Sequence, residues 1–120
     1  MTQDHRPLSR LRSQLDLLAE TFISQILDHD PAVTEGKVMT IGPPPYRRLD
    51  CDGRALAYIK SRPRRGWVRV DLTGLWRLPA LGPLVVSSAS GASLLIRSYD
   101  DADEASAIVT EMIERTRRAA

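Results

Sequence analysis

The sequence contains no asparagine and a single cysteine, Cys51. Without asparagine the chain has no acceptor for N-linked glycosylation, and one cysteine excludes a disulfide within the chain. No apolar run approaches the length of about 18 residues that a membrane-spanning helix needs. Because the first residues also lack the basic-then-apolar pattern of a secretion signal, we expect a cytoplasmic protein without membrane contact.

Motifs that mark common enzyme classes are missing as well. There is no phosphate-binding glycine loop, no dinucleotide fingerprint and no serine-hydrolase elbow. The histidines that would activate Cys51 as a nucleophile are His5, in a terminus (1–6) that we expect to be frayed, and His29, at an expected helix end. We therefore expect Cys51 to be a half-buried structural residue, and we expect no catalytic site and no cofactor.

Residue types that bind metals gather only at positions 28–35. Asp28, His29, Asp30 and Glu35 match no zinc motif in their spacing, and they lack the glycine and the ligand series of an EF-hand. We interpret them as a solvated helix end and expect no metal.

The composition is that of an ordinary soluble domain. The 120 residues have a mass of 13.4 kDa, and 42% are hydrophobic and 27% charged, which argues against disorder. This length predicts a single domain, 1–120. Arginine outnumbers lysine by 15 to 2, and with 12 alanines this suggests a GC-rich bacterial genome.

The net charge of +2 conceals an uneven distribution along the chain. Residues 1–36 carry a net charge of −3, residues 37–77 a net charge of +7, and residues 98–120 again −3. The middle of the chain is thus basic and both ends are acidic. A functional interpretation has to account for this basic centre.

Hydrophobic periodicity predicts two helices with strands between them. Apolar residues recur every three or four positions over 7–28 and 101–118, which is typical of amphipathic helices. Between the helices the period changes to two, and Asp52-Gly53 is a strong signal for a two-residue hairpin turn. We expect about five strands, drawn from residues 37–42, 46–51, 54–60, 67–72, 84–88 and 92–97.

The predicted fold class is α+β, with an antiparallel sheet and both helices packed on one of its faces. Two helices cannot cover both faces, so one face of the sheet is left open or buried in a partner. Which face is open decides what the protein can bind.

One arrangement suits association with another protein. The Asp52-Gly53 turn predicts the cross-strand pairs 51–54, 49–56 and 47–58. If the helices cover Leu49, Leu56 and Tyr58, the open face is mixed in charge and suits a homodimer or another protein partner. We favour this arrangement because it buries more apolar area, and we expect a non-enzymatic interaction module. Its candidate interface residues are Tyr46, Arg48, Ile59, Trp67, Arg69 and Trp76.

The opposite arrangement leaves a basic and aromatic open face, which is typical of proteins that bind single-stranded nucleic acid. The alternative function is therefore weak binding of a nucleic acid or another polyanion. For the basic run at 60–65 we favour a solvated hairpin loop over an anion site, and the net charge of +2 is small for a dedicated nucleic-acid binder. The candidate anion-binding residues are Arg47, Arg54, Lys60, Arg62, Arg64 and Arg65.

Overall fold

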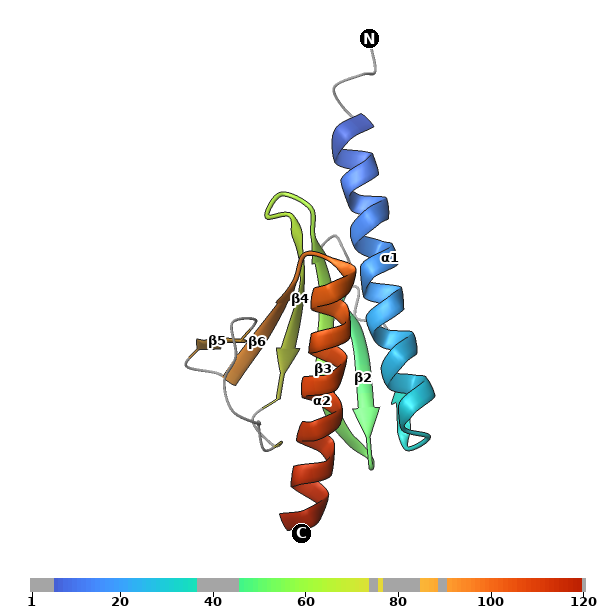
Figure 1. Ribbon diagram of the computed structural model, residues 1–120, viewed down its shortest axis with the longest axis vertical. Helices are drawn as coiled ribbons and strands as arrows, with labels where there is room; N and C mark the ends of the chain where they lie inside the picture. Colours follow the sequence, from blue (N-terminus) through green and yellow to red (C-terminus); the bar gives the residue numbers. More distant parts are fainter. Residues whose placement is uncertain (1–5, 37–45, 74–75, 77–84, 89–90, 120) are drawn as a thin grey trace.

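The computed structural model describes residues 6–36, 46–73, 76, 85–88 and 91–119, with no side-chain description for 6–12, 85–88 and 91. Two helices enclose a run of strands in the sequence (Figure 1). The candidate strand at 37–42 lies outside the described residues. The elements are α1 (Arg6–His29), β1 (Val33–Glu35), β2 (Arg47–Cys51), β3 (Arg54–Arg62), β4 (Trp67–Leu72), β5 (Val85–Ser88), β6 (Gly91–Ile96) and α2 (Tyr99–Ala119).

The strands form one antiparallel sheet in the order β1-β2-β3-β4-β6-β5. Both helices lie side by side on the same side of this sheet (Figure 1). The predicted α+β class and the packing of both helices on one face are therefore confirmed. The three-residue strand β1 was not predicted, because so short a segment shows no alternation of its own.

Local signals explain how the chain enters α2. The Ser98 hydroxyl accepts a hydrogen bond from the Asp101 amide at 3.1 Å, and the Asp101 carboxylate accepts one from the Arg97 amide at 2.9 Å. The Ser98 hydroxyl thus caps an amide that the first helical turn leaves free, and the Asp101 carboxylate binds the amide of the residue before the cap. This second hydrogen bond fixes the backbone of Arg97, the residue that follows β6.

The covered face of the sheet packs against the apolar faces of α1 and α2. Phe22 of α1, Val109 of α2 and Val70 of β4 are each 0% exposed. Alternation along β4 is complete, since every second side chain is buried and the others are half-buried. The sheet side chains of this core include Leu49, Cys51, Leu56, Ala57, Ile59, Val68, Val70, Leu72, Leu94 and Ile96.

A bulge in β3 changes the register that the hairpin turn predicts. Asp52 and Gly53 both have positive φ, 53° and 76°, as a type I′ turn requires, and Cys51 pairs with Arg54 as expected. Further from the turn, however, Leu49 pairs with Ala57 instead of Leu56. One extra residue in β3 shifts the pairing by one position.

This shift moves Tyr58 and Ile59 to the opposite faces from those expected. Ile59 is 1% exposed under the helices, so its predicted place on the open face is wrong. Tyr58, predicted to be in the core, is half-buried on the open face, where it pairs with Arg48 and Asp71. The open face thus combines parts of both arrangements that the sequence allowed.

The bulge can be tested by paired substitutions at the two neighbouring positions. We expect Ile59→Ala to lower the free energy of unfolding by about 2–5 kcal/mol, because it empties a filled core site. Tyr58→Ala should cost clearly less, since that side chain is half-exposed. Urea denaturation of both variants measures the difference, and a larger loss at Tyr58 would contradict the bulged register.

Candidate functional site

The face of the sheet turned away from the helices, here called the open face, is rich in rings and cations. Cross-strand register places most of its side chains in three successive rows across the strands, and Asp50 lies in a further row with Thr34 and Ala55. Successive rows are two residues, or roughly 7 Å, apart along each strand. The charged, aromatic and large apolar side chains of the open face are Tyr46, Arg48, Asp50, Tyr58, Lys60, Arg62, Trp67, Arg69, Asp71, Leu95 and Arg97.

Each of the three rows contains one ring. The first row is Arg62, Trp67 and Arg97; the second is Tyr46, Lys60, Arg69 and Leu95; the third is Arg48, Tyr58, Asp71 and Ser93. The rings therefore come from three adjacent strands, with Trp67 on β4, Tyr58 on β3 and Tyr46 directly before β2. All three rings are half-buried.

A cation lies over each of these rings. The Lys60 ammonium is 4.4 Å from the centre of the Tyr46 ring, and the Arg97 guanidinium is 4.8 Å from that of Trp67. The Arg48 guanidinium lies 6.0 Å from the Tyr58 ring, at the outer limit of a cation–π contact. Each pair joins neighbours within one row.

Two carboxylates neutralise part of the positive charge. Arg48 Nε donates to Asp50 at 2.6 Å, and Arg69 Nε donates to Asp71 at 2.7 Å. Asp71 also accepts a hydrogen bond from the Ser93 hydroxyl at 2.6 Å. The described side chains of this face comprise five cations and two carboxylates, a net charge of +3.

The turn between β3 and β4 extends the basic surface beyond the sheet. The Arg62 carbonyl accepts hydrogen bonds from the Arg65 and Gly66 amides at 3.0 and 2.9 Å. Gly66 has a φ of +81°, which favours glycine. Arg64 and Arg65 are exposed on this turn, next to the row of Arg62, Trp67 and Arg97. Cations are therefore densest at this end of the open face.

The structure brings together some of the residues that the sequence proposed for an interface and separates others. Tyr46, Arg48, Trp67 and Arg69 share the open face. Ile59 does not, and Trp76 is only 5% exposed, within the core cluster. The Trp76 indole N–H donates to the Ala55 carbonyl at 2.8 Å, which fixes the ring inside the fold. The assignment of Trp76 to an exposed interface is therefore wrong.

The proposed anion-binding residues also divide into two groups. Lys60, Arg62, Arg64 and Arg65 lie on or beside the open face. Arg47 is on the helix side, where it forms ion pairs with Glu20 of α1 and with Glu35.

Arg54 belongs neither to the open face nor to the ion pairs that Arg47 forms on the helix side. It follows the β2–β3 turn, and its guanidinium lies 4.5 Å from the centre of the Trp76 ring. The bulge in β3 and the ion pairs of Arg47 with Glu20 and Glu35 separate Arg47 and Arg54 from the other arginines. The sequence shows neither the bulge nor these ion pairs.

Arg97 is a member of the open face that the sequence reasoning missed. The favoured arrangement assigned Tyr58 to the core, and only the opposite arrangement left Tyr58 on the open face. Alternation over residues 92–97 already put Arg97 on the side of Leu95, but no turn signal related that strand to β4. Only the strand order made Arg97 a neighbour of Trp67.

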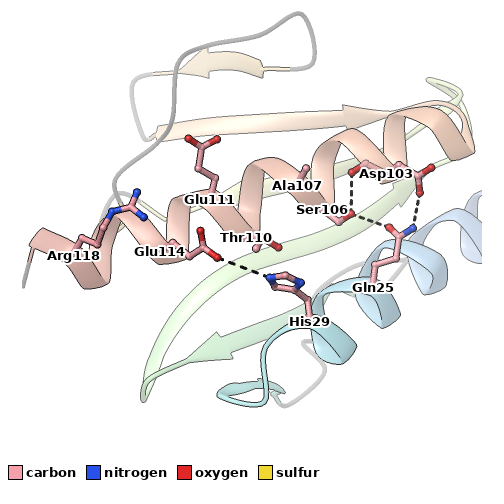
Figure 2. A pocket seen from close by; sticks show the side chains of 9 residues that line it. All are labelled: Gln25, His29, Asp103, Ser106, Ala107, Thr110, Glu111, Glu114 and Arg118. Carbon is pink, nitrogen blue, oxygen red and sulfur yellow. Dashed lines mark hydrogen bonds and ion pairs between the residues drawn. The ribbon is translucent and has the colours of Figure 1, made fainter.

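The helix layer carries the opposite charge. An open groove of about 730 Å³ lies between α1 and α2. Its lining includes Asp103, Glu111 and Glu114 of α2 together with Arg118 (Figure 2). Its polar groups bind one another: Gln25 donates to Asp103 at 2.6 Å, and His29 lies 4.0 Å from Glu114. In the part of the chain that the structure describes, no three potential ligands are grouped to hold a metal ion.

Cys51 lies in the core next to a charged cluster at the end of α2. Its thiol is 0% exposed and 3.6 Å from Arg117, which also donates to Asp30 and Asp52. Burial raises the pKa of the Cys51 thiol, and Asp52 adds to the rise against a smaller lowering by Arg117. No hydrogen bond joins Cys51 to His29, both of which the structure describes. Nothing in this geometry activates the thiol as a nucleophile.

Comparison of the chain with protein-family models, with curated proteins and with solved structures finds no match. Neither helix of the described residues is long and apolar enough to cross a bilayer. The chemistry of the open face therefore has to be interpreted from its own side chains.

The cluster around Arg117 predicts a pH-dependent contribution to stability. Hydrogen bonds from Arg117 lower the pKa of Asp52 below its ordinary value of 3.8. A lowered carboxyl pKa stabilises the fold above the ordinary pKa, and this contribution is lost as the pH falls through the lowered one. Arg117→Gln should therefore reduce the urea midpoint at neutral pH, and its deficit should shrink on acidification.

Arg118→Gln is the matched control, since it removes an exposed arginine one position later that has no ion pair among the described residues. A deficit of Arg117→Gln that persists unchanged at acidic pH would contradict this account.

Proposed function

We propose that this protein is a non-enzymatic binding module that takes a nucleic acid or another polyanion on its open face. The observation that carries the proposal is the net charge of +3 on a face built around three rings. Lys60, Arg62 and Arg97 form no ion pair with a described carboxylate, so their charge is available to a ligand. Arg64 and Arg65 extend this surface at one end.

The charge distribution directs an anionic ligand to one side of the molecule. α1 holds three carboxylates and three arginines, and α2 holds six carboxylates and three arginines, so the two helices together carry a net charge of −3. The helix layer therefore repels a polyanion while the open face attracts it. The small net charge of the whole chain, which argued against a nucleic-acid binder, is the sum of two oppositely charged sides.

The same charge disfavours a twofold pairing of the open face with a second copy. A twofold interface places one patch against itself, which here sets a net charge of +3 against another +3. Leu95 is the single large aliphatic side chain among the described residues of this face. With Ile59 and Trp76 inside the fold, the described side chains of this face lack the apolar centre that homodimers bury.

Matched double variants test the proposal. Lys60→Gln/Arg62→Gln and Arg115→Gln/Arg118→Gln remove the same charge, the first pair from the open face and the second from α2. We expect only the first to weaken binding of a fluorescein-labelled single-stranded oligonucleotide and of labelled heparin in fluorescence anisotropy. The slope of log affinity against log salt should also fall, by about 0.7 for each oligonucleotide phosphate that the variant no longer neutralises.

Two results would overturn the proposal. One is the absence of binding to both polyanions at low salt. The other is an equal reduction of affinity in the two double variants, because the effect would then follow total charge and not the open face.

A further inference from the structure

We infer that the ligand is a single-stranded nucleic acid, whose bases take the places of Lys60, Arg48 and Arg97 on the rings of Tyr46, Tyr58 and Trp67. This inference rests on the proposed function, which requires only an anionic ligand. It adds that the ligand must also have flat, unpaired rings to stack.

The arrangement of the rings supports this inference. Three successive rows of the open face hold one ring each, and these rows follow one another along the strands at roughly 7 Å. The rings also lie on different strands, about 5 Å apart for each strand crossed, so a chain that runs obliquely over β2, β3 and β4 meets one ring in each of these rows. A surface that bound phosphate by charge alone would have no use for a ring in each of these rows.

The cation over each ring marks a face that a base can reach. Arg97 is exposed, and Lys60 and Arg48 are half-exposed at the ends of flexible side chains. A base that stacks on Trp67 displaces only the Arg97 guanidinium and needs no change in the backbone. Stacking of a base on an aromatic ring is stronger than an exposed cation–ring contact.

The displaced cation acquires a new partner in the same step. When a base covers the Tyr46 ring, the Lys60 ammonium is released beside the backbone of that nucleotide and can meet its phosphate. Tyr46 with Lys60 and Trp67 with Arg97 therefore each serve as a base site and a phosphate site for one nucleotide. Tyr58 adds a base site alone, because Arg48 stays paired with Asp50, so the three rings predict a site for about three bases.

Duplex nucleic acid cannot use the rings. Its bases are stacked on one another inside the helix, and its outer surface presents phosphates and groove edges. A duplex would contact Arg62, Arg64 and Arg65 but would leave the ring–cation pairs intact. The open face should therefore prefer a single strand to a duplex of equal length.

The fluorescence of Trp67 provides a direct test. The variant Trp76→Phe leaves Trp67 as the single tryptophan, and the Ala55 carbonyl then keeps its hydrogen bond from the Thr73 hydroxyl, which is 3.0 Å long. We would titrate this variant with an oligothymidylate, with an abasic oligonucleotide of the same length, and with a duplex. We expect Trp67 quenching only with oligothymidylate, and an affinity roughly tenfold or more above that of the abasic strand.

Substitution of the rings provides the second measurement. Trp67→Leu and Tyr58→Leu should each reduce oligothymidylate affinity part of the way to that of the abasic strand, and the double variant further, while binding of the abasic strand is unchanged. The retained binding also shows that the variants are folded. Tyr99→Leu is the matched control, because it removes an aromatic side chain that is 55% exposed at the start of α2.

The outcomes separate this inference from the proposed function. If oligothymidylate, abasic strand and duplex bind equally and Trp67 fluorescence does not change, the inference fails and polyanion binding stands. If none of them binds at low salt, both fail. Ring-dependent binding confined to oligothymidylate supports both.

Discussion

A single extra residue in β3 determines what the open face contains. Leu49 pairs with Ala57 because the bulge shifts the strand by one position, and a shift of one exchanges the two faces of every residue beyond it. Ile59 thereby packs under the helices, and Tyr58 and Lys60 face away from them. The rows of rings and cations exist only in this register.

The sequence was sufficient for the elements and their layering but not for this register. Helical periodicity, the Asp52-Gly53 turn and the alternation over 67–72 are local signals, and each corresponds to an observed element. The bulge is not local in this sense, because it is stabilised by the burial of the adjacent residues Leu56 and Ala57 under the helices. Both are apolar, so their order gives no sign of which one is extra.

The candidate site was predictable where it depends on local signals and not where it depends on contacts between distant residues. Four of the expected interface residues and the basic turn lie on or beside the open face. Their positions could be predicted because they depend only on the alternation of side chains along a single strand. Trp76 was misplaced because its burial depends on a hydrogen bond to the distant Ala55 carbonyl. Arg47 was misplaced because its partners, Glu20 and Glu35, belong to other elements. The positions of Trp76 and Arg47 depend on contacts with other helices and strands, and the local sequence pattern does not show these contacts.

The cations that lie over Tyr46, Tyr58 and Trp67 also bear on the solubility of the free protein. Three uncovered rings on one side of a sheet would form an exposed apolar patch of the kind that promotes aggregation. With a charged group over each ring, that side presents ammonium and guanidinium groups to water. The molecule can therefore keep an aromatic surface without the colloidal instability that such a surface brings when it is uncovered.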